Sequence, residues 1–192
     1  YGKTPPCTKS IIKSGISDVF YPIDDLDKKV KGKSSKILSE HNIKVKKGLL
    51  KNDAKDLYKP YKVNRIYKMP HVVGKIAISK NNLIYSAGNK KITDKVSDKL
   101  THFLRYKNDG IMISSKTLNI DNPKLSCRLK GYEKFSPKRI ILDKYLEIML
   151  SSKIFKSSKK GNTIIFHNSS NISKSKVLKK KGIILIKFKL NK

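Results

Sequence analysis

The sequence predicts an α/β protein with mostly parallel strands. Two observations support this prediction: short, β-branched apolar runs of strand length recur along the chain, and polar stretches of helical length separate several of them. The links between them are short and rich in Gly, Pro and Asn, which favours strand–helix–strand units. The 192 residues allow one or two domains. No apolar run approaches the roughly 18–20 residues that span a bilayer.

The first part of the chain alternates between helical and strand patterns. Gly15 should end the first helix, Gly32 weakens the second, and Pro60 should end or kink the third. In chain order, we expect a helix over 8–14, a strand over 18–23, a helix over 28–40, a strand over 43–46 and a helix over 52–58.

The second part continues the alternation. The next helix should be capped by Thr93 and should bury a stripe formed by Val96, Leu100, Phe103 and Leu104. Turns are expected at Asn81-Asn82 and at 121–123. Strands are predicted over 71–79, 111–114, 139–142, 163–166 and 183–186, with a helix over 174–181 between the last two.

The Met69-Pro70 pair marks a boundary between two parts. We expect residues 1–50 to be the end of one α/β unit, 51–68 a connector, and 69–192 the start of a second unit.

The net charge of +31 has two interpretations. It suggests a nucleic-acid-binding protein, an alternative that stays open. However, 41 of the 45 basic residues are lysines spread along the whole chain, which is typical of an A/T-rich genome, whereas nucleic-acid readers favour clustered arginine. We therefore regard nucleic acid as an unlikely partner, and the four arginines as candidates for roles that lysine cannot fill.

Cys7 follows two prolines and precedes a predicted helix, a position that suits a metal ligand or a nucleophile. It can equally be a small apolar residue without a chemical role. Cys127 is expected to be buried, and the four histidines show no metal spacing. Two cysteines make no disulfide framework, so a cytoplasmic location is the default.

Several segments resemble, in order, the bifunctional deaminase–reductase family of riboflavin biosynthesis. "GKTPPCTKSIIKSGI" is similar to the second zinc-ligand segment of the deaminase domain, and "DDLD" with "VKGK" to a segment that follows it. The resemblance makes Cys7 a Zn²⁺ ligand. The other cysteine and the His-x-Glu pair of the family would lie before Tyr1, so we expect an internal fragment with an incomplete zinc site that does not deaminate.

The second half resembles the reductase domain of that family, through "MPHVVGKIAIS", "KITDKVSDKLTHFLRYKNDGIMISSKTLNIDNPKLSCRL" and "SPKRIILD". The resemblance implies that NADPH is bound by Ala77, Lys91, Thr117 and Asp121. It implies that the substrate is bound by Asn89, Arg105, Leu125 and Arg128. Asn89 and Lys91 replace the usual Ser and Trp, which leaves a degenerate, inactive relative as a further alternative.

The family resemblance implies the C-terminal part of a cytidine-deaminase-like domain followed by the N-terminal part of a dihydrofolate-reductase-like domain. It implies NADPH-dependent reduction of the ribosyl group of 5-amino-6-(5-phosphoribosylamino)uracil to a ribityl chain, with a phosphorylated pyrimidine as the small-molecule partner and a homo-oligomeric parent. No residue stands out as the catalytic acid. The family's cofactor-binding V-E-G-G segment does not occur before Lys192, so we expect this chain to bind NADPH weakly and to be inactive.

Overall fold

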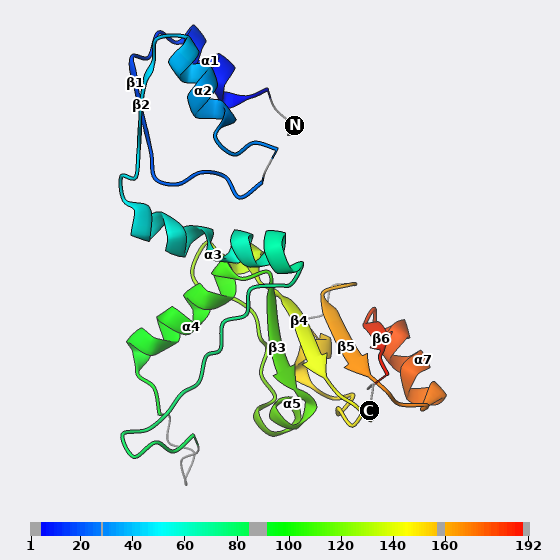
Figure 1. Cartoon of the computed structure of the whole chain (residues 1–192). Coiled ribbons are helices and arrows are strands. Elements are labelled where there is room, and N and C mark those ends of the chain that lie inside the picture. Colours follow the sequence, from blue (N-terminus) through cyan, green and yellow to red (C-terminus); the bar gives the residue numbers. More distant parts are fainter. Residues whose placement is uncertain (1–4, 28, 85–91, 157–159, 190–192) are drawn as a thin grey trace. The chain divides into compact units, whose positions relative to one another are not determined.

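The computed structural model describes residues 5–27, 29–84, 92–156 and 160–189. The chain forms two compact units, Tyr1–Ile76 and Ala77–Lys192, which are drawn in Figure 1. Each unit contains a sheet whose strands are all parallel, so the predicted mixed α/β class is confirmed. None of the helices described is both long and apolar enough to cross a membrane.

The first unit has a two-stranded sheet with helices around it. Gly15 and Gly32 have positive φ angles of 65° and 72°, which glycine adopts without steric strain. Gly15 follows the first helix as predicted, while Gly32 stops the second helix from starting at residue 28. The elements are α1 (Cys7–Lys13), β1 (Asp18–Tyr21), α2 (Lys33–Glu40), β2 (Lys44–Lys47) and α3 (Lys51–Tyr67).

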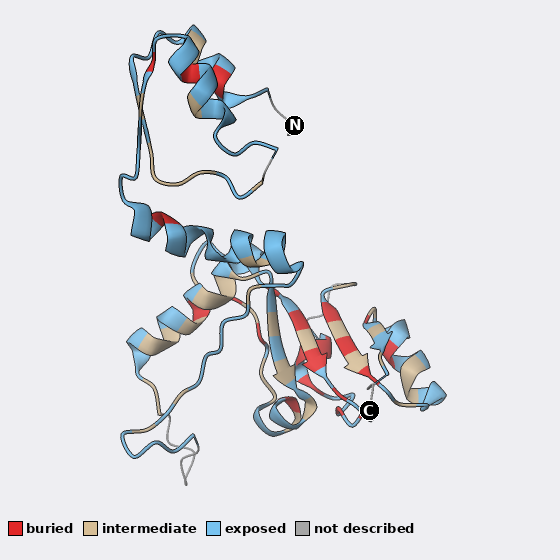
Figure 2. Ribbon diagram, viewed as in Figure 1, coloured by how far each residue is buried: buried red, intermediate tan, exposed pale blue. Residues whose placement is uncertain are grey.

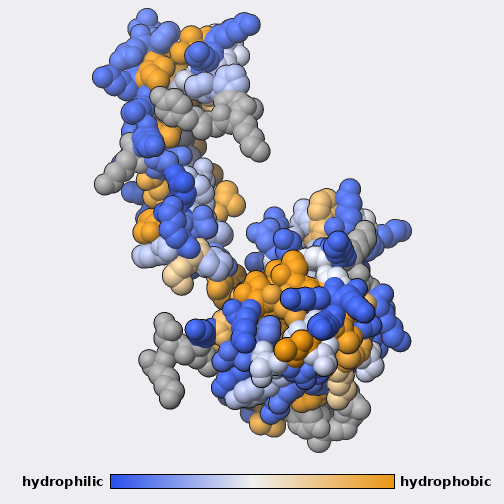
Figure 3. Space-filling view, turned by 90° about the vertical axis from the view of Figure 1, so that its right-hand side faces the viewer, coloured by the Kyte–Doolittle hydropathy of each residue, from blue (hydrophilic) through white to orange (hydrophobic). Residues whose placement is uncertain are grey.

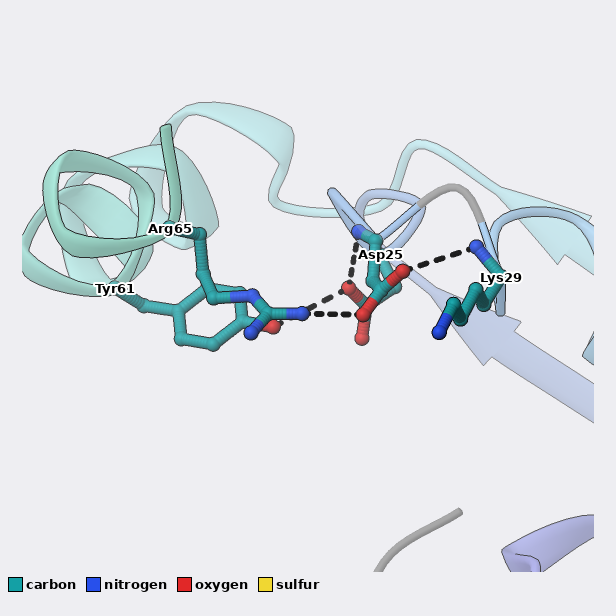
Figure 4. A network of polar contacts seen from close by, with 5 residues as sticks. Asp25, Lys29, Tyr61 and Arg65 are labelled. Atoms are coloured by element: carbon teal, nitrogen blue, oxygen red, sulfur yellow. Dashed lines mark hydrogen bonds and ion pairs between the residues drawn. The ribbon is translucent and has the colours of Figure 1, made fainter. Parts of the chain in front are cut away.

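Helix α3 runs through Pro60, so the prediction that this helix ends near residue 58 is wrong. A proline inside a helix removes one hydrogen bond and costs about 3 kcal/mol. Contacts beyond Pro60 support the second half of the helix: Tyr61 Oη donates to Asp25 Oδ1 at 3.4 Å, and Arg65 pairs with the carboxylate of Asp27. Figure 4 shows Tyr61 and Arg65 pointing from the helix toward the loop that carries Asp25.

The second unit is built on a four-stranded sheet with the order β3-β4-β5-β6, so consecutive strands are neighbours. Residues Met112, Ile140, Ile164 and Ile184 lie side by side across this sheet. The elements are α4 (Lys95–Lys107), β3 (Gly110–Ser114), α5 (Ser115–Asp121), the short 3₁₀ helix η1 (Glu133–Phe135), β4 (Lys138–Leu142), α6 (Lys153–Lys156), β5 (Thr163–His167), α7 (Ile172–Lys180) and β6 (Ile184–Lys187).

One face of this sheet holds the hydrophobic core. Ile141 and Ile165 on the strands pack in a single cluster with Leu118 of α5, Ile154 of α6 and Leu178 of α7, and all five are fully buried. Right-handed crossovers between neighbouring parallel strands place the connecting helices on one face, which explains this arrangement. Figure 2 shows the buried residues concentrated on β4 and β5.

The opposite face of the sheet is apolar and only partly covered. Met112, Leu142, Ile184 and Ile186 on this face are between 38% and 56% exposed. Hydrophobic side chains accordingly form a patch on the surface of this unit, bordered by hydrophilic side chains (Figure 3). Parallel sheets are usually covered on both faces, so this one has an unpartnered face within the part of the chain described.

Three further predictions are wrong. Residues 71–79 form no strand, because the described residues supply no hydrogen-bonded neighbour for them. The cap of α4 is Asp94, one residue after Thr93. Three of the four residues of the predicted stripe are not buried: Val96, Leu100 and Phe103 are 72%, 57% and 43% exposed, whereas Leu104 is half-buried.

Candidate functional site

Helix α4 positions one of the candidate residues, Arg105, together with a histidine. Asp94 Oδ1 accepts a hydrogen bond from Ser97 N at 2.7 Å, which fixes the start of the helix. The face of α4 that turns inward carries His102 and Arg105 rather than the predicted apolar stripe. Both contact the extended segment 125–128, which carries the remaining candidate arginine.

His102 holds this segment against the helix. The imidazole is 8% exposed, and its Nδ1 accepts a hydrogen bond from the backbone N–H of Arg128 at 3.1 Å. The thiol of Cys127, buried as predicted, lies 3.5 Å from the carbonyl oxygen of His102 and donates to it. Burial, and then the positive charges of Arg105 and Arg128, lower the pKa of His102, so this ring is neutral at pH 7.

Arg105 is held by a main-chain carbonyl, and the charge of Asp98 acts on it without forming an ion pair within the described residues. Its Nη1 donates to the carbonyl oxygen of Ser126 at 2.9 Å, whereas its Nε is buried and has no hydrogen-bond partner among the described residues. Burial, and then the nearby charge of Arg128, lower the pKa of Arg105. Neither guanidinium forms an ion pair with a carboxylate of the described residues. The two cations therefore repel each other, and an anion bound between them would stabilise both.

Leu125 contributes its backbone rather than its side chain to the surface. Its side chain is 3% exposed within the core, and its φ angle of 56° is unusual for a leucine. The polypeptide turns here before entering the segment that carries Arg128. A ligand could contact only the main chain of Leu125.

Thr117 and Asp121 lie on α5, directly after β3. Ser114 Oγ accepts a hydrogen bond from Thr117 N at 3.2 Å and lies 3.1 Å from Thr117 Oγ1. The side chains of Thr117 and Asp121 are both exposed. Thr117 lies in the first turn of α5, next to the carboxyl end of a parallel strand, where α/β proteins commonly bind ligands, whereas Asp121 is the last residue of the helix. No hydrogen bond or ion pair within the described part of the chain joins them to Arg105 or Arg128.

The other candidates are less well defined. Ala77 is half-buried in an extended segment that is not part of a sheet. Asn89 and Lys91 lie outside the described residues. Cys7 is the exposed first residue of α1, and among the residues described no group of three or more His, Cys, Asp or Glu side chains could hold a metal ion. The described residues therefore do not form a zinc site.

Sequence reasoning missed two residues that shape this region. His102 was not among the candidates, and its structural role is to hold the backbone of Arg128. Asp143, the last letter of "RIILD", is 1% exposed, and its carboxylate accepts hydrogen bonds from Glu147 N at 2.8 Å and Ile148 N at 3.0 Å. The sequence did offer a signal for Asp143: an acidic residue directly after an apolar strand can accept hydrogen bonds from the backbone of the turn that follows.

Comparisons with known proteins agree on one family. A family model described as RibD C-terminal domain matches residues 70–192. The riboflavin biosynthesis proteins RibD of Aquifex aeolicus and Bacillus amyloliquefaciens are each 32% identical over 185 residues, which is 95% of this chain and 51% and 50% of those proteins. The chain thus spans about half the length of the curated relatives it matches.

Two solved structures are similar to this chain. A Thermotoga maritima diaminohydroxyphosphoribosylaminopyrimidine deaminase/5-amino-6-(5-phosphoribosylamino)uracil reductase superposes with a TM-score of 0.75 and 28% identity, over 98% of this chain and 58% of that one. Acinetobacter baumannii RibD (form 2), at 24% identity, shares the fold with a TM-score of 0.77 over 99% of this chain and 53% of that one. With a family model covering well over half of its residues, the chain belongs to the RibD family.

Proposed function

We propose that this chain belongs to an enzyme of riboflavin biosynthesis whose second unit reduces the ribosyl group of 5-amino-6-(5-phosphoribosylamino)uracil to a ribityl chain. The observation that carries the proposal is the pair of guanidinium groups, Arg105 and Arg128, held near each other without an ion-pair partner among the described carboxylates. Arginine binds phosphate through paired, charge-assisted hydrogen bonds. The 5-phosphate of this substrate is the anion that we assign to the two arginines.

We assign the substrate to the region around the end of α4 and the cofactor to the region around α5. Arg105 and Arg128 hold the phosphate, the main chain at Leu125 contributes to the same pocket, and Asn89 contacts the substrate. The buried, neutral ring of His102 keeps Arg128 in register with Arg105. Fixing the phosphate in this way positions the sugar carbon that is reduced.

NADPH supplies the hydride when it is bound. The exposed hydroxyls and the N–H groups where β3 joins α5 suit a cofactor that carries phosphate and ribose oxygens. We assign Thr117 and Asp121 to this task, together with Ala77 and Lys91.

For the first unit, we propose the C-terminal part of a cytidine-deaminase-like domain over residues 1–50, with 51–68 as a connector and a dihydrofolate-reductase-like domain over 69–192. Cys7 would be one Zn²⁺ ligand of that deaminase. Because the described residues form no zinc site, we derive no deamination step for this chain. We further propose a cytoplasmic protein that is a homo-oligomer in its whole form.

A second candidate function is supported by one surface feature. Tyr106, Tyr132 and Phe135 form a cluster with ring centroids 4.8 to 6.3 Å apart, and Lys134 lies 5.1 Å from the Phe135 centroid. Aromatic rings among lysines can stack on unpaired bases. Binding to single-stranded RNA that persists at physiological salt and is lost in Tyr132→Ala would favour this candidate.

The first function is tested by calorimetric titration of the chain with 5-amino-6-(5-phosphoribosylamino)uracil. We expect saturable binding that Arg128→Gln weakens about tenfold, a loss of roughly 1.4 kcal/mol. As a matched control, Lys99→Gln removes one positive charge from exposed α4 surface and should leave the affinity unchanged. Equal affinity in the Arg128 and Lys99 variants would rule out the assigned phosphate site.

A further inference from the structure

A hollow of about 500 Å³ lies where β5 and β6 end, beside the first turns of α7. Of the residues assigned to substrate and cofactor, none that the structure describes lines it. Parallel α/β sheets commonly bind ligands at the carboxyl ends of their strands. The hollow therefore occupies a favourable place in the fold without having a role in the function proposed above.

The lining of the hollow is cationic. Lys176 and Lys179 reach it from α7 and Lys187 from the end of β6, and none of the described Asp or Glu residues lines it. The whole segment 148–192 carries twelve lysines and no acidic residue. An anion in the hollow would therefore meet positive charge from two elements and no described carboxylate to oppose it.

General lysine excess does not account for a second feature, the state of His167. This residue ends β5, lines the hollow and is only 6% exposed. Its backbone carbonyl accepts a hydrogen bond from Phe188 N at 2.9 Å, but its Nδ1 is buried and has no hydrogen-bond partner among the described residues. Buried polar atoms are rarely left in this state, so a ligand that supplies a partner for Nδ1 is a physical explanation.

The start of α7 offers further donors. Asn171 Oδ1 accepts from Lys174 N at 2.9 Å, which satisfies one N–H group of the first turn, while the others have no partner within the helix. Ser169 Oγ already accepts from Asn171 N at 3.1 Å, so its hydroxyl hydrogen remains available to an anion. The helix dipole adds a favourable interaction with negative charge at this end.

We propose that this hollow binds a phosphate group, either as inorganic phosphate or as the monoester of a small molecule. Lys176, Lys179 and Lys187 supply the charge, and His167 with the first turn of α7 supplies directed hydrogen bonds. Ile172 and Leu185 line the same hollow and give an apolar wall against which the organic part of an ester can pack.

The test is a titration of the ¹⁵N-labelled 192-residue chain with sodium phosphate at constant ionic strength, followed by amide chemical shifts. We expect saturable shifts concentrated at residues 167–173 and 187. The double variant Lys179→Gln/Lys187→Gln should weaken the affinity at least tenfold. Lys180→Gln/Lys181→Gln removes the same charge from neighbouring residues that do not line the hollow, and it should leave the affinity within twofold.

Equal weakening by both double variants, or non-saturable shifts spread over lysines of the whole chain, would overturn the proposal. Ribose 5-phosphate identifies the source: tighter binding than phosphate at the same amides indicates an ester, and equal binding indicates the phosphate group alone. Arg128→Gln separates the two sites. It should abolish shifts at 102–105 and 126–128 while those at 167–173 persist; shifts confined to 102–105 and 126–128 would reject the hollow and leave the proposed function standing.

Discussion

The backbone N–H of Arg128 donates a hydrogen bond to Nδ1 of His102 at 3.1 Å, and this bond ties the candidate phosphate ligand to helix α4. A ring nitrogen can accept a hydrogen bond only while it is unprotonated. The charges of Arg105 and Arg128 help to keep it so, because they lower the pKa of the same ring. The hydrogen bond that holds Arg128 thus requires a neutral His102, and the charges of the two arginines favour that neutral form.

This dependence predicts a loss of stability in acid. The pKa of His102 is lower in the folded chain than in the unfolded chain, so the unfolded state takes up a proton first as the pH falls. The stabilising contribution is present above the unfolded pKa of about 6.5 and is lost progressively below it. Urea unfolding at pH 7.5 and pH 5.0 should show a lower free energy of unfolding at the lower pH.

The variant His102→Gln isolates this effect, because an amide can still accept the bond from Arg128 but does not titrate in this range. The variant should show a smaller difference between the two pH values than the unmodified chain. His41→Gln, which changes an exposed histidine directly after α2, serves as control and should retain the full difference in unfolding free energy between the two pH values. An undiminished difference in His102→Gln would show that another group governs the acid sensitivity.

The two arginines should respond differently to replacement. Arg128 has an exposed side chain, so Arg128→Gln should reduce substrate affinity about tenfold while changing the free energy of unfolding by less than about 0.5 kcal/mol. Arg105 is partly buried and bonds to the Ser126 carbonyl, so Arg105→Gln should lower both affinity and stability, the latter by about 1–2 kcal/mol. Calorimetric titration and urea unfolding of both variants measure the two effects; equal stability losses would contradict the structure.

Adjacent isoleucines test the two faces of the sheet. Ile183 is 4% exposed and belongs to the core, whereas Ile184 is 43% exposed on the uncovered face. Ile183→Ala should cost about 2–5 kcal/mol of unfolding free energy, and Ile184→Ala less than about 1 kcal/mol. Equal costs in chemical denaturation would mean that the second face is covered in solution.

Asp143 provides a test of the loop after β4. Its carboxylate accepts two backbone hydrogen bonds, from Glu147 and Ile148, while being 1% exposed. Asp143→Ala should destabilise the chain by about 2–4 kcal/mol because the buried N–H of Ile148 and the partly buried N–H of Glu147 lose their partner. Asp143→Asn keeps one carbonyl acceptor and should cost less, as thermal unfolding would reveal. A larger loss for Asn than for Ala would contradict this account.

The loop that supports α3 is a further test. The pKa of Asp27 is lowered chiefly by the hydrogen bond from Lys29 N and also by Arg65, so the carboxylate remains charged at neutral pH. Asp27→Asn should leave the helix before Pro60 unchanged and speed amide hydrogen exchange several-fold in residues 61–67. Asp56→Asn, on the same helix but outside this network, should leave that rate unaltered. Equal exchange in both variants would show that the network does not hold the helix.

The sequence was a good guide wherever local patterns decide structure. Apolar β-branched runs such as Ile111–Ser114 and Thr163–Phe166 are strands in the fold because each pairs with a parallel neighbour, β3 with β4, and β5 with β4 and β6. Residues 71–79 are also rich in Val and Ile, yet they form no strand. Strand formation requires a hydrogen-bonded neighbour, which no local pattern reveals.

Helix α4 shows a second limit. Its apolar periodicity predicted Val96, Leu100 and Phe103 as the buried face, yet the structure turns His102 and Arg105 inward. The segment 125–128 decides this orientation through polar contacts, and hydrophobic periodicity cannot detect such contacts. The two arginines could be selected because the segments that carry them resemble those of a known family. No such resemblance pointed to His102, which orients Arg128.

The uncovered face of the second sheet has a consequence for how this protein behaves at high concentration. Two copies that associated through this face, which carries Met112, Leu142, Ile184 and Ile186, would bury apolar area. The net charge of +31 on each copy opposes this association. Electrostatic repulsion reaches about 10 Å in 0.1 M salt but only about 3 Å in 1 M salt. Dilute buffers should therefore keep the chain dispersed, and added salt should drive it into reversible self-association, so its colloidal behaviour depends mainly on lysines outside the proposed binding sites.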